Sequence, residues 1–552
     1  MARTPFVDVL RRAAAIAAHA RRTGQPLDEV VAVEREMRVD HARRKFLRDS
    51  AGASAALALA ACAPVPFKPA PDDNEVVIVG AGVAGLTCAY RLRQAGTRVR
   101  VFEAQERIGG RMFSLTNHFA DGQVCELGGE LIDTGHARIR ALAAELGLAL
   151  DDLSQDPTAA AGDIWFANGR RYSEHDILVA FAPLAAAIAR DAETIPDEEI
   201  TYATPGGVEA LDRESMTQWL DRNGASGWLR KLIEVAYTTE MGLECSEQSA
   251  LNFLTFIDPG TESFKIFGES DEAWRIEGGS SKLIKALVDA LTKNKIKMNQ
   301  SYTLTGIENE NGRIALSFDA PGGAQHHTFD AVILALPFTC LRKVEGLERL
   351  PLSPEKLKCI RELGMGKNAK IMVGTKSRVW RSPVSDLPVL SNGNICSDLG
   401  FQDFWETSRR QKPSEAGILT VFLGGDAALP DKKYTFDAFR ADLAKMSPKM
   451  AESLDPTAVL PFFWSSYRYT LGSYSGAQVG QYTTMYTEAR KAAFDGRLQF
   501  AGEHTEGPDN NGYMNGGVKS GNRAAQNLLK IMGLPYALPH AKSCPHRLSS
   551  AC

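Results

Sequence analysis

The 552-residue sequence has no uninterrupted apolar run of the roughly 18–20 residues that a membrane-spanning helix needs. It also lacks an excess of either sign of charge, since 63 Lys and Arg residues balance 67 Asp and Glu residues, a net charge of −4. This balance gives no reason to expect nucleic acid or an anionic membrane as a partner. A hydrophobic content of 44% at this length is typical of a globular protein with two or more domains.

The nine cysteines form no CxxC pair and show no zinc-like spacing with histidine. No metal site is therefore predicted, and no Ser/His/Asp arrangement indicates hydrolytic chemistry. Cys544 and Cys552 lie in a polar tail over residues 536–552, and the sequence leaves open whether they pair.

Residues 1–62 are predicted to be an export signal with an N-terminal extension. Ala42 to Arg48 reads Ala-Arg-Arg-Lys-Phe-Leu-Arg, and an apolar run of small residues follows, a pattern similar to a twin-arginine signal. Cys62 follows Leu-Ala-Ala as in a lipoprotein cleavage box, which makes it a candidate lipid-anchor site. Export places the protein in the periplasm; the alternative is an Ala-rich helix on a cytoplasmic protein. A Pro-rich linker is predicted over residues 63–73.

A dinucleotide-binding motif follows the linker. Glu75 to Val79 is predicted to be a buried parallel strand, and Val83 to Gln94 a helix. Between and within them, Gly80, Gly82 and Gly85 have GxGxxG spacing, which allows a tight turn and a close approach of the backbone to a pyrophosphate. The start of the helix offers unpaired N–H groups to the phosphates.

The second strand is predicted over Arg98 to Phe102, and Glu103 and Ala104 follow at its end. A carboxylate at this place suits a ribose hydroxyl and repels a 2′-phosphate. The motif alone leaves both NAD and FAD open.

The fold class predicted from the whole pattern is α/β with two interleaved domains. A Rossmann-like nucleotide-binding domain and a substrate domain with a mixed sheet and helices are expected to alternate along the chain. The nucleotide-binding segments are 74–149, 271–345 and 491–535, and the substrate segments are 150–270 and 346–490.

Six segments carry a resemblance over roughly residues 74–535. They read Val-Gly-Ala-Gly-Val-Ala-Gly-Leu, Glu-Ala-Gln-Glu-Arg-Ile-Gly-Gly-Arg, Glu-Leu-Gly-Gly, Met-Gly-Lys-Asn-Ala-Lys, Phe-Ala-Gly-Glu-His-Thr and Gly-Tyr-Met-Asn-Gly-Gly. In this order they resemble the flavin-containing amine oxidases, which include monoamine, polyamine and L-amino-acid oxidases. The resemblance implies bound FAD as the cofactor.

The resemblance also implies which residues hold FAD. It places Glu103 on the adenosine ribose and Arg111 near the pyrophosphate, where Gly110 allows close backbone approach. Glu503 is expected to reach the phosphate–ribityl region, and the backbone of Met514 to lie by the flavin ring.

Three residues are implied to be catalytic. Lys370 matches the family's flavin-facing lysine, with Lys367 as a nearby rival. Tyr474 and Tyr513 match the two walls of an aromatic cage that holds the amine. His504, beside Glu503, is interpreted as a structural hydrogen-bonding residue.

Departures from the family pattern bear on the cofactor and the substrate. Ser473 occupies the position of the cysteine that bonds covalently to flavin in monoamine oxidases, so FAD is predicted to be non-covalent. Glu130 occupies the region in which venom-type L-amino-acid oxidases carry a carboxylate-binding arginine, and it is expected to attract a cationic amine. Arg409 is a candidate carboxylate clamp, so a basic amino acid stays open as substrate.

The implied reaction removes a hydride from the amine-bearing carbon of a primary amine or polyamine. The resulting imine hydrolyses to a carbonyl compound and ammonia. The alternatives are oxidation of a basic L-amino acid and, on a related FAD scaffold, carbon–carbon desaturation or isomerisation. The electron acceptor, oxygen or another compound, and the oligomeric state, a homodimer included, are left open.

Overall fold

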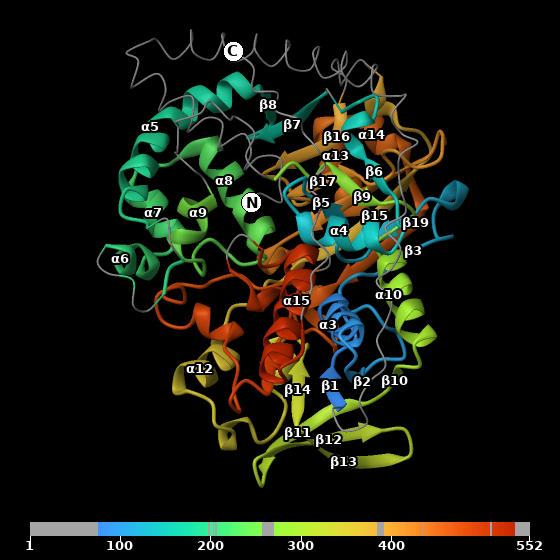
Figure 1. Ribbon diagram of the computed structural model, residues 1–552. Helices are drawn as coiled ribbons and strands as arrows, with labels where there is room; N and C mark the ends of the chain where they lie inside the picture. Colours follow the sequence, from blue (N-terminus) through green and yellow to red (C-terminus); the bar gives the residue numbers. More distant parts are fainter. Residues whose placement is uncertain are drawn as a thin grey trace, which may run out of the picture.

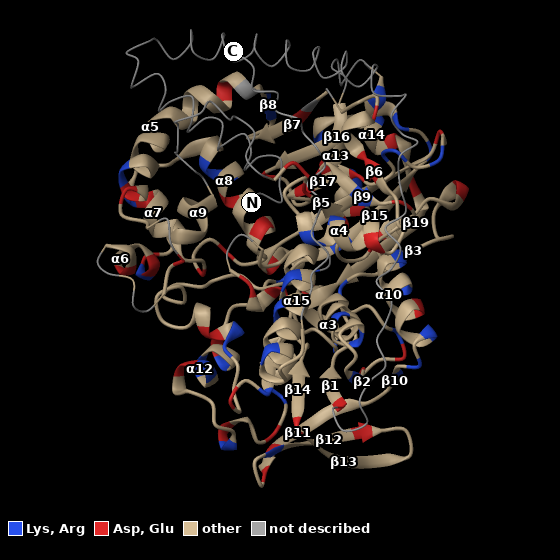
Figure 2. Cartoon of the chain, in the orientation of Figure 1, with Lys and Arg blue, Asp and Glu red and all other residues tan. Residues whose placement is uncertain are grey.

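The computed structural model describes residues 75–535, apart from residues 160, 197–198, 202–203, 205–206, 257–269, 383–390, 433 and 508–509. The predicted export signal with Cys62, the linker at 63–73, and the tail with Cys544 and Cys552 lie outside the described residues and stay predictions. In Figure 2, basic and acidic residues are interspersed along the elements. No helix in the described part of the chain is long and apolar enough to cross a membrane.

A five-stranded parallel sheet forms the centre of the lower half of Figure 1. Its strands, in spatial order, are β10 (Lys297–Asn299), β2 (Arg98–Phe102), β1 (Glu75–Val79), β14 (Ala331–Leu334) and β20 (Leu498–Phe500). The two strands of the predicted nucleotide motif therefore pair directly. Val76 to Val79 of β1 are β-branched, apolar and buried, as in a sheet that is covered on both faces, whereas β2 also carries Arg98 and Arg100.

Three helices pack together beside this sheet: α3 (Val83–Gln94), α10 (Ser281–Lys293) and α15 (Met514–Ile531). The close contact between α3 and α15 depends on Gly521, because a Cβ atom there would lie 2.3 Å from the carbonyl oxygen of Ala84. The last helix of the fold is thereby held against the first nucleotide-binding turn, although the two are far apart in sequence.

A seven-stranded mixed sheet lies in the upper part of Figure 1. Its strands, in spatial order, are β19 (Leu454–Phe463), β15 (Ala369–Thr375), β18 (Gly417–Leu423), β17 (Asp403–Glu406), β16 (Ser391–Ser397), β7 (Gly162–Ala167) and β8 (Arg170–Tyr172). Only the β16–β7 pair is parallel among these described strands. This sheet is the mixed sheet that the sequence predicted.

The smaller sheets and the remaining helices complete the described fold. The sheets pair β11 (Thr303–Glu310), β12 (Arg313–Ala320) and β13 (Gly323–Phe329); β3 (Ser114–Leu115) and β4 (Cys125–Glu126); and β5 (Leu131–Ile132), β9 (Trp274–Ile276) and β6 (Leu150–Asp152). The helices are α4 (Ala137–Glu145), α5 (Glu174–Ala192), α6 (Val208–Arg213), α7 (Met216–Arg222), α8 (Gly227–Met241), α9 (Ala250–Phe256), α11 (Phe338–Leu341), α12 (Pro354–Glu362), α13 (Phe436–Met446) and α14 (Pro448–Ser453).

The five-stranded sheet draws strands from all three predicted nucleotide-binding segments, and the seven-stranded sheet draws strands from both predicted substrate segments. The third strand of the β5–β9–β6 sheet begins at Leu150, one residue beyond the predicted segment end at 149. β6 lies in the predicted substrate segment but pairs with β9 of a predicted nucleotide-binding segment. The division into domains therefore stays a prediction.

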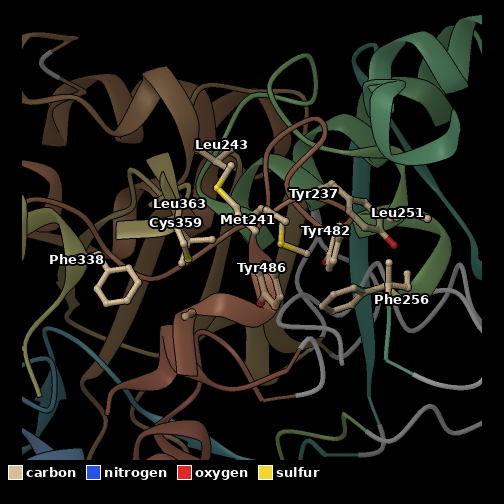
Figure 3. Packing of buried hydrophobic residues seen from close by; sticks show 14 of the residues in the cluster. Tyr237, Met241, Leu243, Leu251, Phe256, Phe338, Cys359, Leu363, Tyr482 and Tyr486 are labelled. Atoms are coloured by element: carbon tan, nitrogen blue, oxygen red, sulfur yellow. The ribbon is translucent and has the colours of Figure 1, made fainter. Parts of the chain in front are cut away.

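The largest apolar cluster joins the two regions. It contains Val77 and Phe102 of the parallel sheet together with Tyr237 and Met241 of α8. Figure 3 shows part of this cluster, in which Tyr486 lies near Met241. A shared core of this kind holds the substrate helices rigidly against the nucleotide-binding sheet.

Candidate active site

The turn after β1 is built for close backbone approach. Gly80 has a φ of 106°, and a Cβ atom there would lie 2.5 Å from the carbonyl oxygen of Ala335. A Cβ atom on Gly82 would meet no atom closer than 3.9 Å, so its space opens onto the cavity described below. Helix α3 starts at Val83 without a side-chain cap, which leaves its first N–H groups available to an anion.

Glu103 lies at the end of β2 and is buried. Its carboxylate accepts hydrogen bonds from the backbone N–H of Ala81 at 2.8 Å and of Gln105 at 3.1 Å. Burial raises the pKa of Glu103, although these hydrogen bonds oppose the rise. The carboxyl group is therefore held beside the glycine turn, where a ribose would lie in a dinucleotide-binding unit.

Arg111 and Glu503 form an ion pair across the cavity wall. The guanidinium Nη1 lies 2.6 Å from Glu503 Oε1 and donates to the carbonyl oxygen of Ser473 at 2.7 Å. Glu503 also accepts from the Ser475 hydroxyl at 2.7 Å and from the backbone N–H of Gly512. Burial alone would raise the pKa of Glu503, but Arg111 and the other donors lower it to about 2.

Lys370, on β15, is a buried cation with a carboxylate partner. Its Nζ lies 3.0 Å from Glu130 Oε2 and donates to the carbonyl oxygens of Gly128 at 2.9 Å and Glu126 at 3.2 Å. Burial would raise the pKa of Glu130, but Lys370 and Arg275 lower it below its usual value. The ion pair thus fixes a charged lysine at the cavity wall.

The rival lysine lies elsewhere. Lys367 pairs with Asp426 at 3.1 Å and with Glu247 at 3.6 Å, and it does not line the cavity. The structure therefore favours Lys370 over Lys367 as the lysine of the site.

Tyr474 and Tyr513 both line the cavity. The hydroxyl of Tyr474 donates to the carbonyl oxygen of Thr239 at 2.9 Å, which fixes one ring. The ring of Tyr513 packs against His136 with a centroid distance of 4.8 Å. The two predicted cage residues thus reach one cavity from segments that the sequence separates.

The cavity has a volume of about 350 Å³ and is lined by residues of both regions. It brings together most of the residues predicted from the sequence, namely Gly80, Gly82, Glu103, Ala104, Gly110, Arg111, Glu130, Lys370, Tyr474, Glu503, Tyr513 and Met514. Gly85 lies behind the wall, where a Cβ atom would be 2.0 Å from the carbonyl oxygen of Gly80. Its role is helix–strand packing.

The two predicted substrate-binding residues, Glu130 and Arg409, differ in their relation to the cavity. Arg409 does not line the cavity; its Nε donates to the carbonyl oxygen of Glu406, and its own carbonyl oxygen accepts from Arg275. Arg409 lies in the turn after β17, and a carboxylate clamp at this position stays a prediction. Glu130 does line the cavity, but its charge is neutralised by Lys370 and is not a free attractant for a cationic amine.

Several lining residues were not predicted. Trp405 on β17 and Phe422 on β18 meet with a ring centroid distance of 5.4 Å, and Trp464 lies nearby in the same wall. The sequence is rich in aromatic residues at Phe401–Trp405 and from residue 462 onward. It did not show which side chains face inward, because that depends on strand pairing.

The residues fit a flavin dinucleotide. A glycine turn, an uncapped helix start and a buried carboxylate lie in one part of the wall, and the Arg111–Glu503 pair in another. Ser473 donates its hydroxyl hydrogen to Asn368 at 2.6 Å and offers no thiol for a covalent link.

Comparison with known proteins points the same way. The family model described as "Flavin containing amine oxidoreductase" matches residues 83–529. Amine oxidase A (flavin-containing) of Canis lupus familiaris is 24% identical over 493 residues, which cover 83% of this chain and 85% of that protein. An L-amino acid oxidase of Bothriechis schlegelii is 24% identical over 488 residues, which cover 86% and 93%.

A solved structure shares the fold. The cyclohexylamine oxidase of Brevibacterium oxydans IH-35A superposes with a TM-score of 0.69 at 21% identity, covering 84% of this chain and all (100%) of that one.

Proposed function

Because the chain belongs to the family of flavin-containing amine oxidoreductases, we propose that it oxidises a primary amine or polyamine at the carbon bearing the nitrogen. The enzyme is FAD-dependent, and FAD accepts the hydride when it is bound. The substrate loses that hydride and a proton and becomes an imine. Water then converts the imine to a carbonyl compound and ammonia.

The lining at the tyrosine end supports a substrate that is an amine without a carboxylate. Of the described residues, four cations line the cavity: Arg111, Lys343, Lys370 and Arg468. Arg111 and Lys370 are already paired with Glu503 and Glu130. Near Lys370, therefore, each of these cavity-lining lysine and arginine residues already has an acidic partner.

The other two cations lie toward the nucleotide end. Arg468 packs on the ring of Tyr469, which shares a neighbouring pocket with Ala104 and Gln105. Lys343 lies a few residues after Ala335, whose carbonyl oxygen contacts the glycine turn of the nucleotide end at Gly80. An amino-acid substrate would thus place its carboxylate beside the tyrosines, where no free positive charge is available to pair with it. This placement is electrostatically unfavourable.

The tyrosine end supplies shape and exclusion of water. Tyr474, Tyr513, Trp405 and Phe422 line the cavity, and aromatic rings there can attract an amine and keep water away from the reacting carbon. The side chains thereby orient the substrate, which is the protein's main contribution to a hydride transfer.

An anaerobic titration tests this function. The purified holoenzyme is mixed with a panel of primary amines, diamines, polyamines and L-amino acids, and loss of the oxidised flavin absorbance is followed. We expect amines to bleach the flavin faster than amino acids. Preferential bleaching by basic L-amino acids would support the alternative activity, and bleaching by no amine or amino acid would overturn both and favour desaturation or isomerisation.

Replacement of Tyr513 tests the aromatic wall. In Tyr513→Ala, kcat/KM for the best amine is expected to fall by about tenfold to a hundredfold, because the reacting carbon is no longer held in place. FAD content is expected to stay unchanged, and Tyr513→Phe, which keeps the ring, should retain most of the activity. Steady-state kinetics and the ratio of flavin to protein absorbance measure both. Unchanged kinetics in Tyr513→Ala would remove Tyr513 from the substrate site.

A further inference from the structure

His136 is a buried residue that supports one wall of the cavity without being one of the described residues that line it. Its ring packs against the ring of Tyr513, with a centroid distance of 4.8 Å and an interplanar angle of 60°. Tyr513 does line the cavity and is half-buried, whereas His136 is 1% exposed. Tyr513 thus contributes surface to the cavity while its ring rests on a side chain that solvent does not reach. His136 is not among the site residues predicted from the sequence.

Asp133, three residues earlier, holds the imidazole of His136. The backbone N–H of Asp133 donates to Nδ1 at 3.0 Å, so in the neutral ring the hydrogen is on Nε2. Nε2 lies 3.3 Å from Asp133 Oδ2, close enough for an attraction between its N–H and the carboxylate. Burial raises the pKa of Asp133 to about 6, which leaves the carboxyl group mostly ionised at neutral pH. Both ring nitrogens of His136 are therefore held by one residue.

The turn that carries Asp133 and His136 is itself fixed. It connects β5 to α4, and the backbone N–H of His136 donates to the carbonyl oxygen of Asp133 at 3.0 Å. Asp133 Oδ1 accepts from the backbone N–H of Glu272 at 2.9 Å. The backbone N–H of Thr134 donates to Asp271 Oδ1 at 2.8 Å. These partners lie just before β9, which pairs with β5, so the turn is tied to its neighbouring strand.

The same turn is joined to the helix that follows Tyr513. Tyr513 is the N-cap residue of α15, and α4 begins directly after His136. The backbone N–H of Ile139 in α4 donates to Asn515 Oδ1 in α15 at 3.0 Å. The starts of the two helices therefore keep a fixed separation, and the rings of His136 and Tyr513 meet there.

We propose that His136, held by Asp133, is a positioning residue that fixes the orientation of the Tyr513 ring toward the substrate. A tyrosine side chain has several staggered rotamers, and a ring at a cavity wall has open space on one side. Its support on the other side therefore decides which orientation it keeps. Hydride transfer is sensitive to the alignment of the reacting carbon, so this orientation affects the rate. This role rests on the proposed function, in which Tyr513 contacts the amine.

A double-mutant cycle combined with structures tests this role. His136→Ala, Tyr513→Ala and the double variant are compared with the wild-type holoenzyme, using the amine that bleaches the flavin fastest. Steady-state kinetics give kcat and KM, absorbance gives FAD per protein, and thermal unfolding gives the midpoint. Crystal structures of the wild-type and His136→Ala holoenzymes show the position of the Tyr513 ring.

We expect His136→Ala to lower kcat/KM by about tenfold, mainly through kcat, because the amine still enters but is aligned less well. FAD content should stay unchanged. The double variant should be slower than Tyr513→Ala by no more than about twofold, because His136 acts through the tyrosine. His136→Phe keeps a ring against Tyr513 and should recover most of the lost kcat/KM. In the His136→Ala structure, the Tyr513 ring should be displaced or occupy more than one rotamer.

A control for lost stability is Leu142→Ala, at a buried position further along α4. It should lower the unfolding midpoint at least as much as His136→Ala and leave kcat/KM within about twofold. Additive losses in the cycle, or a lower midpoint in His136→Ala with unchanged kcat/KM, would make His136 a structural residue only. If no amine bleaches the wild-type flavin, the proposed function fails. An unmoved Tyr513 ring in the His136→Ala structure overturns the positioning role whatever the substrate is.

Discussion

Replacing Lys370 by methionine is expected to destabilise the protein by about 3–5 kcal/mol, the usual cost of removing one partner from a buried ion pair. Lys370 and Glu130 have side-chain exposures of 7% and 3%, and their charged atoms lie 3.0 Å apart. Without Lys370, burial raises the pKa of Glu130, which takes up a proton or remains an unpaired charge. Denaturant unfolding of the holoenzyme measures the change.

Two further variants isolate the pair. In the double variant Lys370→Met with Glu130→Leu, no charge is left unpaired, and most of the lost stability should return. Lys367→Met is a matched control on the same segment, because Lys367 is 29% exposed in its ion pairs and such pairs contribute only about 0–1 kcal/mol. Equal losses in Lys370→Met and Lys367→Met would show that the buried pair has no special weight.

Replacing Glu503 by glutamine is expected to reduce both stability and FAD retention. The substitution keeps the size of the side chain but leaves Arg111 without its negative partner, at a cost of about 3–5 kcal/mol. Misplacement of Arg111 is also expected to weaken FAD binding by at least about tenfold, because hydrogen bonds to charged groups contribute about 1.5–3 kcal/mol. The flavin absorbance per protein and the unfolding free energy measure the two effects.

The dependence of the unfolding free energy on pH below 4.5 provides a second measurement on Glu503. Its pKa is about 2 in the folded protein, against a usual value of 4.5. The carboxylate therefore stabilises the fold above pH 4.5, and this contribution is lost as the pH falls from 4.5 toward 2. Glu503→Gln should lose stability less steeply over this interval. An identical slope in the variant would contradict the assignment of the charge to Glu503.

Local structure in the first nucleotide-binding unit follows the sequence closely. The predicted strand Glu75–Val79, helix Val83–Gln94 and strand Arg98–Phe102 are β1, α3 and β2 with the same bounds. The largely apolar stretch from Phe329 to Pro337 reads as one buried strand in the sequence, whereas β14 spans only Ala331–Leu334. Phe329 instead ends the antiparallel strand β13, and an apolar run does not show where one strand gives way to the next.

The chemistry of single positions also followed from the sequence, but their partners did not. Lys370 lines the cavity, and its catalytic role stays a prediction, while the neutralising contact with Glu130 was not predicted. His504 was expected to make structural hydrogen bonds and makes none to the described residues. Arg409 was expected near the substrate; it lies in the turn after β17, where its Nε donates to the carbonyl oxygen of Glu406 and its own carbonyl oxygen accepts from Arg275.

By itself the sequence determined the glycine turn, the acidic residue after β2 and, through family resemblance, the FAD cofactor. These features depend on the order and spacing of residues in short segments, where backbone geometry is set locally. Tertiary structure alone decided that Glu130 pairs with Lys370 across 240 residues and Arg111 with Glu503 across 392. Charge pairing at such separations depends on how distant elements pack, and the packing also determines which charges are left free for a substrate.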